Sequence, residues 1–434
     1  MLVPRTLILA LGLATACSAR SPRTATWLTS IGGTREAGAY GQAVAVAPAG
    51  GAAMVWEARG VVRAGTQRFG VASREPVLVL STYDRAGVLA WSRRVASPTC
   101  PAPTFAPALW LAPDGGAVVA VAERPGGQIC VLRFDARGAI AWSLRLDELR
   151  GIPALGVATD GQIALTGAHE FEGVHAVVAI SPRGAIVWRR ELPIAPEQLA
   201  VAPAGAIHVV GSVVAGSPAV LVDRDPSTAD VDAVELVTLD ADGTTRARLP
   251  ISTPGAGHEP LALVLTADDD AAYVGWNTLT HGPMTWTSHL VKLVAGRVAW
   301  SRSERGVGLG AIAAADGVVA TVRVAGGDPF VQLIGADGSD RARYRLAGAL
   351  VESQVPISGL SLAKLAMSAG SLALTGYAEK RVEIDAVGTI RTSCRWVSHQ
   401  QPGMEVVRYE ACDPAAWLAR FSLARPGASA QGAR

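Results

Sequence analysis

Residues 83–91, Tyr-Asp-Arg-Ala-Gly-Val-Leu-Ala-Trp, contain the repeated motif that decides the fold. The variants Phe-Asp-Ala-Arg-Gly-Ala-Ile-Ala-Trp at 134–142 and Ile-Ser-Pro-Arg-Gly-Ala-Ile-Val-Trp at 180–188 keep its spacing, and a shorter copy occupies 295–300. Each copy places a tight turn with glycine between two apolar runs of strand length, which is typical of a β-hairpin. Copies without tryptophan lie at 239–249, 334–344 and 384–392.

A second motif, a run of small apolar residues followed by a turn, alternates with the first. It occurs at 43–50, 109–115, 156–161 and 199–205, with later copies near 263–270, 312–317 and 362–370. Two hairpins per period make a four-stranded antiparallel sheet, and seven such units follow one another about every 44 to 66 residues. Because one sheet alone cannot bury both faces, neighbouring copies must stack, and a closed ring leaves only short edges. The repeats therefore predict an all-β fold, a single seven-bladed β-propeller of four-stranded antiparallel blades over residues 26–424, with eight or six blades as the alternatives.

The two ends of the repeat region are incomplete in a complementary way. Residues 26–31, which include Trp27, match a fourth strand without the preceding three, and residues 416–423 match a third strand without a fourth. We therefore expect the N-terminal strand to complete the last blade and close the ring. Residues 394–412 are irregular and could be an excursion or part of an extra blade, and residues 425–434 are expected to be a disordered tail.

Composition excludes several classes of protein. The chain has 434 residues, of which 50% are hydrophobic and 18% charged, so it lacks the low hydrophobicity and high net charge of a disordered protein. Its 39 basic and 37 acidic residues leave a net charge of +2, whereas nucleic-acid binders usually carry a basic excess. No stretch after the N-terminus has the roughly 18 uninterrupted apolar residues of a transmembrane helix.

The N-terminus has the features of a targeting segment. A short basic region is followed by an apolar run at 6–16, and the run ends in Leu13-Ala14-Thr15-Ala16-Cys17, which resembles the lipobox of bacterial lipoproteins. The resemblance implies that residues 1–17 are a signal peptide with lipidation at Cys17, and that residues 18–25 are a tether. It places the protein in the bacterial cell envelope, anchored by lipid to the periplasmic or surface face of the outer membrane. The alternative is ordinary cleavage near Ala16, which would make the protein secreted.

Four further cysteines, Cys100, Cys130, Cys394 and Cys412, fit export to an oxidising compartment. Four cysteines allow three pairings, and proximity favours Cys100–Cys130 with Cys394–Cys412. Their spacing matches no zinc site, so we expect disulfides rather than metal.

The Asp-x-x-Gly-x-x-x-Trp motif is similar to the repeats of bacterial quinoprotein-like propellers and of secreted bacterial propeller-repeat proteins. In the quinoprotein group, outer-strand tryptophans dock neighbouring blades, which implies that role for Trp27, Trp91, Trp142, Trp188 and Trp300. The turn here is one residue shorter than the usual quinoprotein form. The adjacent cysteine pair of quinone-binding alcohol dehydrogenases is absent, so the resemblance implies no quinone cofactor.

Two segments are candidate ligand sites. Asp223, Asp225, Asp230 and Asp232 form an acidic cluster that could bind calcium, although solvated loop charges explain it equally simply. The aspartates at 268–270 are weaker metal candidates, because aspartate is favoured in turns for local hydrogen bonding.

The second segment, residues 276–289, contains Trp276, His281, Trp286 and His289 in an excursion that interrupts the fifth unit. If exposed, these side chains could contact a glycan or peptide, since binding often resides on loops. They could equally pack beneath their own loop.

The sequence contains no recognisable set of acid, base and nucleophile. We therefore predict a non-enzymatic binding or scaffold protein of the envelope, a monomer whose partner is a protein, peptide or glycan. It would have no nucleic-acid partner, no cofactor other than possible calcium, and no membrane contact except its lipid. The alternative is an enzyme (a hydrolase, lyase or oxidoreductase) whose polar residues converge from separate blades at the mouth of the central channel.

Overall fold

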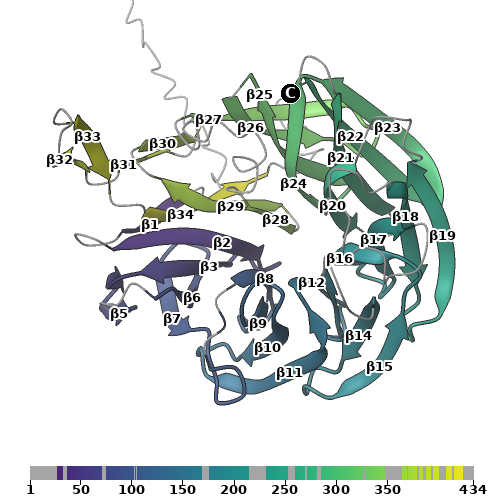
Figure 1. Ribbon diagram of the computed structural model, residues 1–434, viewed down its shortest axis with the longest axis horizontal. Helices are drawn as coiled ribbons and strands as arrows, with labels where there is room; N and C mark the ends of the chain where they lie inside the picture. Colours follow the sequence, from purple (N-terminus) through teal and green to yellow (C-terminus); the bar gives the residue numbers. More distant parts are fainter. Residues whose placement is uncertain are drawn as a thin grey trace, which may run out of the picture.

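The structure is a computed structural model that describes residues 27–423, apart from 33–36, 71–74, 102, 104, 169–174, 215–230, 253–259, 269–270, 281–284, 327, 348–363, 369, 379–380, 385–387, 392–393, 400–406 and 413–414. Seven blades, each built on four antiparallel strands, surround a central axis (Figure 1). The prediction of an all-β, seven-bladed propeller is therefore confirmed, and the described part of the chain contains no helix. Within that part, no helix that could span a membrane is found.

Each blade runs from an innermost strand at the axis to an outermost strand on the circumference. Blades 1 to 3 comprise β2 (Gly38–Val46), β3 (Ala52–Arg59), β6 (Val77–Tyr83) and β7 (Leu89–Arg94); β8 (Phe105–Leu111), β9 (Ala117–Ala122), β10 (Gln128–Phe134) and β11 (Ile140–Arg150); and β12 (Ile152–Val157), β13 (Ile163–Ala168), β14 (Ala176–Ile180) and β15 (Ile186–Glu191). Blades 4 and 5 comprise β16 (Ala195–Val201), β17 (Ile207–Val214), β18 (Val231–Leu239) and β19 (Thr245–Ser252); and β20 (Pro260–Asp268), β21 (Ala271–Thr280), β22 (Thr285–Val294) and β23 (Arg297–Arg305). Blades 6 and 7 comprise β24 (Val307–Ala315), β25 (Val318–Ala325), β26 (Asp328–Ile334) and β27 (Asp340–Ala347); and β28 (Lys364–Ser368), β29 (Ser371–Ala378), β34 (Ala415–Ser422) and β1 (Trp27–Gly32).

The remaining strands form hairpins outside the seven blades. In blade 1, β4 (Val62–Ala64) pairs with β5 (Gln67–Phe69). Between β29 and β34, β30 (Arg381–Ile384) and β31 (Gly388–Arg391) extend blade 6 at the edge of β27, and β32 (Cys394–His399) pairs with β33 (Val407–Cys412). The irregular segment at 394–412 is therefore an excursion and not an eighth blade.

The ring closes through its two ends. Strand β1 pairs antiparallel with β34 and is the outermost strand of blade 7. The register places Trp27 opposite Arg420 and Ser30 opposite Trp417, so residues almost 400 positions apart are hydrogen-bonded neighbours. The predicted completion of the last blade by the N-terminal strand is confirmed.

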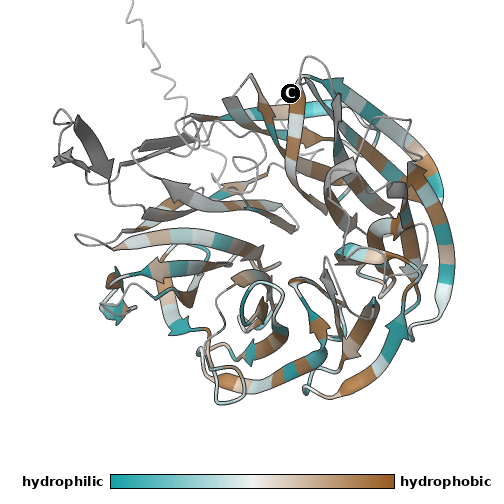
Figure 2. Ribbon diagram, viewed as in Figure 1, coloured by the Kyte–Doolittle hydropathy of each residue, from teal (hydrophilic) through white to brown (hydrophobic). Residues whose placement is uncertain are grey.

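The core is divided among the seven interfaces between blades, one apolar cluster to each interface. The middle strands supply most of it: all six residues of β9 are buried, as are all seven of β6. These strands read as continuous apolar runs because both faces of each blade pack against a neighbouring blade. Figure 2 shows the contrast, with hydrophilic positions concentrated on the long outer strands such as β11, β15 and β19.

The glycine turns of the first motif are held by local hydrogen bonds. The carboxylate of Asp84 accepts from the backbone N–H of Ala86 at 2.8 Å and of Val88 at 2.9 Å, while Gly87 adopts a φ of +84°. Such a left-handed conformation favours glycine, because a side chain there would be strained. The Asp and Gly of the motif therefore fix the turn between the third and fourth strands.

Five blade junctions are latched by an outer-strand tryptophan. The indole N–H of Trp91 in blade 1 donates to the carbonyl of Ala136 in blade 2 at 3.0 Å, and the indole covers Gly138 so closely that a Cβ there would lie 2.7 Å from the ring. The same contacts join Trp27, Trp142, Trp188 and Trp300 to the turns that contain Gly87, Gly184, Gly243 and Gly338. Each such contact, which we call an indole latch, crosses from one blade to the next.

The two junctions without an indole latch lack both the tryptophan and the glycine turn that would face it. Ala247 and Ala342 occupy the positions in blades 4 and 6 where the motif elsewhere has tryptophan. After blade 4, the facing turn in blade 5 is shortened to Ala295-Gly296, and no atom lies within 4 Å of a Cβ built on Gly296. After blade 6, the turn is replaced by the seam between β34 and β1.

A disulfide joins Cys100, in the connection between blades 1 and 2, to Cys130 on β10, with a Cα–Cα distance of 6.0 Å. This is the pair that proximity favours. The register of the β32–β33 hairpin places Cys394 directly opposite Cys412, while the side chains of that pair lie outside the described residues.

Substitution of two glycines separates the contribution of the indole latch to stability from that of backbone strain. Gly138 and Gly296 share a left-handed backbone, with φ of +78° and +73°, but only Gly138 faces an indole. We predict that Gly296→Ala costs about 1–2 kcal/mol through strain alone, and that Gly138→Ala costs about 1–3 kcal/mol more through overpacking against Trp91. Denaturant unfolding of both variants measures the difference; equal losses would mean that the indole contact adds no constraint.

Candidate functional site

The seven innermost strands enclose a cavity of about 560 Å³ on the propeller axis. Its wall is formed by the ends of these strands and is mostly small and apolar, for example Ala45, Val157, Ala200, Ala314 and Ala366. Small side chains are required here because seven strands converge on one axis. We call the polar end of this cavity the channel mouth, lined by Trp110, Thr159, Thr266, Asp268, Asp316 and Ser368.

Most polar groups of the channel mouth bond to a neighbouring blade. The hydroxyl of Thr159 in blade 3 donates to the carbonyl of Pro203 in blade 4 at 2.9 Å. The hydroxyl of Ser368 in blade 7 donates to the carbonyl of Ala47 in blade 1 at 3.2 Å. These two hydroxyls are structural links around the ring.

Blade 5 is linked to blade 6 in the same way. The backbone N–H of Gly317 donates to the carboxylate of Asp268 at 2.6 Å, and the N–H of Ala314 donates to the hydroxyl of Thr266 at 3.2 Å. Asp268, the first residue of the acidic run at 268–270, therefore links blade 5 to blade 6 by a hydrogen bond. Positions 269–270 lie outside the described residues.

Asp316 and Trp110 are the other polar or aromatic side chains of the channel mouth. Asp316 is exposed in a left-handed turn with φ of +53° and has no hydrogen-bond or ion-pair partner among the described residues. The guanidinium of Arg133 lies 5.8 Å from the Trp110 ring centroid and pairs with Asp114 at 3.4 Å. Among the described residues, the mouth thus offers a ligand one carboxylate without a partner, Asp316, and one indole, Trp110.

Blade 4 contains two half-buried titratable side chains off the channel. Burial raises the pKa of Glu197, whose carboxylate accepts a hydrogen bond from Ser212 at 2.7 Å. Burial also lowers the pKa of His208 to about 4, with Arg246 adding to the effect, and its Nδ1 lies 3.1 Å from the Thr238 hydroxyl. His208 is therefore neutral at pH 7, and each group has a local partner.

In the described part of the candidate segment 276–289, residues 276–280 belong to β21 and residues 285–289 to β22, which pair with each other. Trp276 is buried at 7% exposure. Its indole stacks on His289 at 5.0 Å, and the two ring nitrogens of His289 contact Thr278 and Ser303. Of the two alternatives, exposure and packing, Trp276 takes the second, because strand alternation turns this side chain into the interface of blades 4 and 5. Trp286 is half-buried, and His281 lies outside the described residues.

The predicted calcium ligands cannot be placed together. Asp223, Asp225 and Asp230 lie outside the described residues, and Asp232 is described only as a backbone position in β18. Elsewhere in the described chain, no group of three or more histidine, cysteine or carboxylate side chains could hold a metal.

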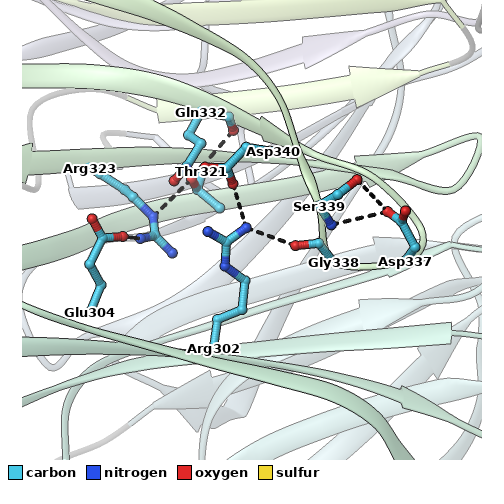
Figure 3. Close-up of polar contacts among 9 residues, drawn as sticks. All are labelled: Arg302, Glu304, Thr321, Arg323, Gln332, Asp337, Gly338, Ser339 and Asp340. Atoms are coloured by element: carbon cyan, nitrogen blue, oxygen red, sulfur yellow. Dashed lines mark hydrogen bonds and ion pairs between the residues drawn. The ribbon is translucent and has the colours of Figure 1, made fainter.

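A polar network joins blades 5 and 6 on the circumference (Figure 3). Arg302 on β23 donates to the carbonyl of Gly338 at 2.9 Å and pairs with Asp340, which lowers the pKa of that carboxyl. The fully buried Arg323 pairs with Glu304 on β23 and contacts Thr321. This network lies beside the indole latch of Trp300 and reinforces the same junction.

Comparison with known proteins gives likeness in fold alone. No family model matches the chain, and no curated protein matches it in sequence. The β-propeller domain of the Trilobed protease from Pyrococcus furiosus is 10% identical over 84% of this chain and 95% of that one, with a TM-score of 0.44. The acylaminoacyl peptidase of Pyrococcus horikoshii is 11% identical with a TM-score of 0.45, and the match covers 89% of this chain but 57% of the peptidase. The WD40 domain of SCAP from fission yeast is 9% identical over 91% of this chain and 98% of that one, with a TM-score of 0.40.

The pKa of His208 predicts how acid destabilises the fold. Between about pH 6.5 and pH 4 the unfolded chain takes up a proton on this histidine while the native protein does not, so stability falls as the pH falls. The full loss, reached below pH 4, is about 3 kcal/mol. Glu197 contributes with the opposite sign, because its raised pKa favours the native state on protonation. The difference between the wild type and His208→Gln, in denaturant unfolding from pH 7.5 to pH 4 (about the range in which histidine titrates), therefore isolates His208. Parallel curves would show that His208 is not buried as described.

Proposed function

We propose that this chain is a lipid-anchored propeller of the bacterial envelope that binds a partner without transforming it. The observation that carries the proposal is the chemistry of the channel mouth. Its hydroxyls and the carboxylate of Asp268 bond to the backbone of neighbouring blades, which explains their presence without any catalytic role. General acid–base catalysis needs a proton-transferring group held within reach of the substrate, and the one carboxylate of the mouth without a partner among the described residues is Asp316.

The half-buried His208 and Glu197 also support a structural role. A histidine with a pKa near 4 that contacts a threonine, and a glutamate bound to a serine, are both satisfied inside one blade. Neither lines the cavity on the axis. We therefore assign them to the folding of blade 4 and not to chemistry on a substrate.

Two features support a location in the cell envelope. The sequence before Cys17 resembles a lipobox, and the Cys100–Cys130 disulfide suits an oxidising compartment. Lipidation of Cys17 would hold the propeller at a membrane through a tether that ends near β1. Because β1 is the outermost strand of blade 7, the tether would start from the circumference of the ring and leave both faces open to partners.

Lipidation at Cys17 is tested by substitution in the native host. Cys17→Ser removes the thiol that would accept the lipid, whereas Ser18→Ala leaves it in place. We expect Ser18→Ala to partition into the detergent phase and to incorporate labelled palmitate as the wild type does, and Cys17→Ser to lose both properties. Unchanged partitioning of Cys17→Ser would end the lipoprotein proposal.

Binding without turnover is tested with the full chain carrying Cys17→Ser, incubated with panels of peptides and glycans. We expect ligands to be retained by the protein and recovered with unchanged mass. Release of a shortened or oxidised ligand, abolished by Asp316→Asn, would instead establish an enzyme at the channel mouth.

A further inference from the structure

The outermost strands of six blades carry an unusual charge. Together β7, β11, β15, β19, β23 and β27 contain fourteen arginines, no lysine and five carboxylates. We call these arginines the arginine belt, and they are Arg93, Arg94, Arg145, Arg150, Arg189, Arg190, Arg246, Arg248, Arg297, Arg302, Arg305, Arg341, Arg343 and Arg345. The seventh outer strand, β1, is uncharged.

The rest of the chain has the opposite balance. It holds 25 basic and 32 acidic residues, so the near-zero net charge of the whole conceals a basic circumference and an acidic remainder. A compositional bias for arginine over lysine explains which basic residue is used. It does not explain why fourteen of the basic residues gather on these six short strands, where they outnumber the carboxylates fourteen to five.

Protection of exposed strand edges explains why the outermost strands are charged, but not why their charge is positive. Outer strands expose unpaired backbone groups, and charged side chains keep such edges from pairing with other chains. Aspartate, glutamate or a mixture would serve that purpose equally. Arginine outnumbers carboxylate on five of the six charged outer strands, and β11 carries two of each. This excess of one sign points to a partner of negative charge.

Several belt arginines are already neutralised within the protein. Arg302 pairs with Asp340, as Figure 3 shows, and Arg145 pairs with Glu123 and Asp147. These side chains support blade junctions and strands. The available positive charge is concentrated elsewhere on the belt.

A groove between the outer strands of blades 3 and 4 gathers three of the arginines. It has a volume of about 560 Å³, and its walls are Arg189, Arg190, Glu191 and Pro193 on one side with Thr245 and Arg248 on the other. Arg189 and Arg190 are exposed and have no hydrogen-bond or ion-pair partner among the described residues. The volume falls in the range of small-ligand sites.

A buried carboxylate holds the guanidinium of Arg248 in one orientation. Its Nε and Nη2 donate to the two carboxylate oxygens of Glu235, both at 2.7 Å, and Glu235 is 7% exposed. A guanidinium has five N–H donors, so three remain for a ligand in a side chain that is already ordered. The groove thus joins one oriented guanidinium to two exposed ones, and its wall carries the carboxylate of Glu191 while Glu235 is already paired with Arg248.

We propose that this groove and the arginine belt bind an anionic polysaccharide, whose carboxylate or sulfate groups pair with Arg189, Arg190 and Arg248. The inference rests on the proposed function and names the class of its partner. Guanidinium groups pair with such oxyanions through two parallel hydrogen bonds, which is the chemistry that distinguishes arginine from lysine.

The shape of the belt favours a flexible chain over other polyanions. The belt follows the convex wall of the ring, so a flat bilayer would touch a short arc of it, whereas a polysaccharide can follow the curve (Figure 1). Single-stranded nucleic acid is held largely by stacking of bases on aromatic side chains. The belt tryptophans Trp91, Trp142, Trp188 and Trp300 lie instead against the glycine turns of the next blade.

The test measures binding of the full chain carrying Cys17→Ser to fluorescent dextran sulfate and to oligogalacturonate, with neutral dextran as the uncharged control. The variant Arg189→Gln with Arg190→Gln removes two charges from the groove. The matched control, Arg63→Gln with Arg68→Gln, removes two exposed charges from the β4–β5 hairpin, where the two side chains face each other across the register. Both double variants are checked for unchanged thermal unfolding.

We expect both anionic polymers to bind, the neutral one not to bind, and the affinity to fall steeply between about 50 mM and about 200 mM salt. The groove variant should bind at least about tenfold more weakly, and the hairpin variant within about twofold of the parent. Equal loss in the two double variants would reduce the interaction to net charge and overturn the site.

Other outcomes separate this inference from the proposed function. Stronger binding to phosphatidylglycerol vesicles or to single-stranded DNA than to the polysaccharides would overturn the assigned partner. Failure to bind either anionic polymer would overturn the inference and leave the lipid anchor and the binding role standing. Shortening of a polymer, measured by its elution on size exclusion, would overturn the non-enzymatic function itself.

Discussion

The seating of an indole on a glycine turn of the next blade is the contact on which the arrangement of the ring depends. An apolar interface between two sheets resists separation but tolerates sliding, because the hydrophobic effect has no direction. The indole latch adds direction: the ring fits where the turn has no Cβ, and the N–H reaches one carbonyl of that turn. Repeated at five junctions, it sets the position of each blade against its neighbour.

The same device made the fold predictable from the sequence. A tryptophan and a glycine that recur at fixed spacing mark the fourth strand and the turn before it, so the blades could be counted and the stray strand at Trp27 could be assigned to the seam. The excursion at 394–412 was ambiguous because its irregular sequence does not show whether its strands join a larger sheet. Only the strand pairing shows that β32 and β33 bond to each other in a two-stranded sheet and form no blade of their own.

The site was much less predictable, for physical reasons. Trp276 has the sequence surroundings of a surface loop, but its exposure depends on which face of a long hairpin it occupies. The channel mouth draws one or two residues from each of several blades, and the groove combines β15 with β19, so neither has a spacing in the sequence. The arginine excess was visible in composition, whereas its confinement to the circumference emerges only once the outermost strands are known.

Not every junction is secured in the same manner. Between blades 6 and 7, where no tryptophan docks, strand β30 from the blade 7 insertion pairs with the edge of β27 and clasps the two blades together. Between blades 4 and 5, the described residues provide neither an indole latch nor a shared strand, and the two blades are held by apolar packing that includes Trp276. Within the described residues, the propeller is therefore a ring with one junction, that of blades 4 and 5, that neither an indole latch nor a shared strand fastens, and this junction is well away in sequence from the seam. Elastic deformation of the ring, whether caused by heat or by a ligand bound on its axis, should concentrate at the junction of blades 4 and 5 and separate those two blades first.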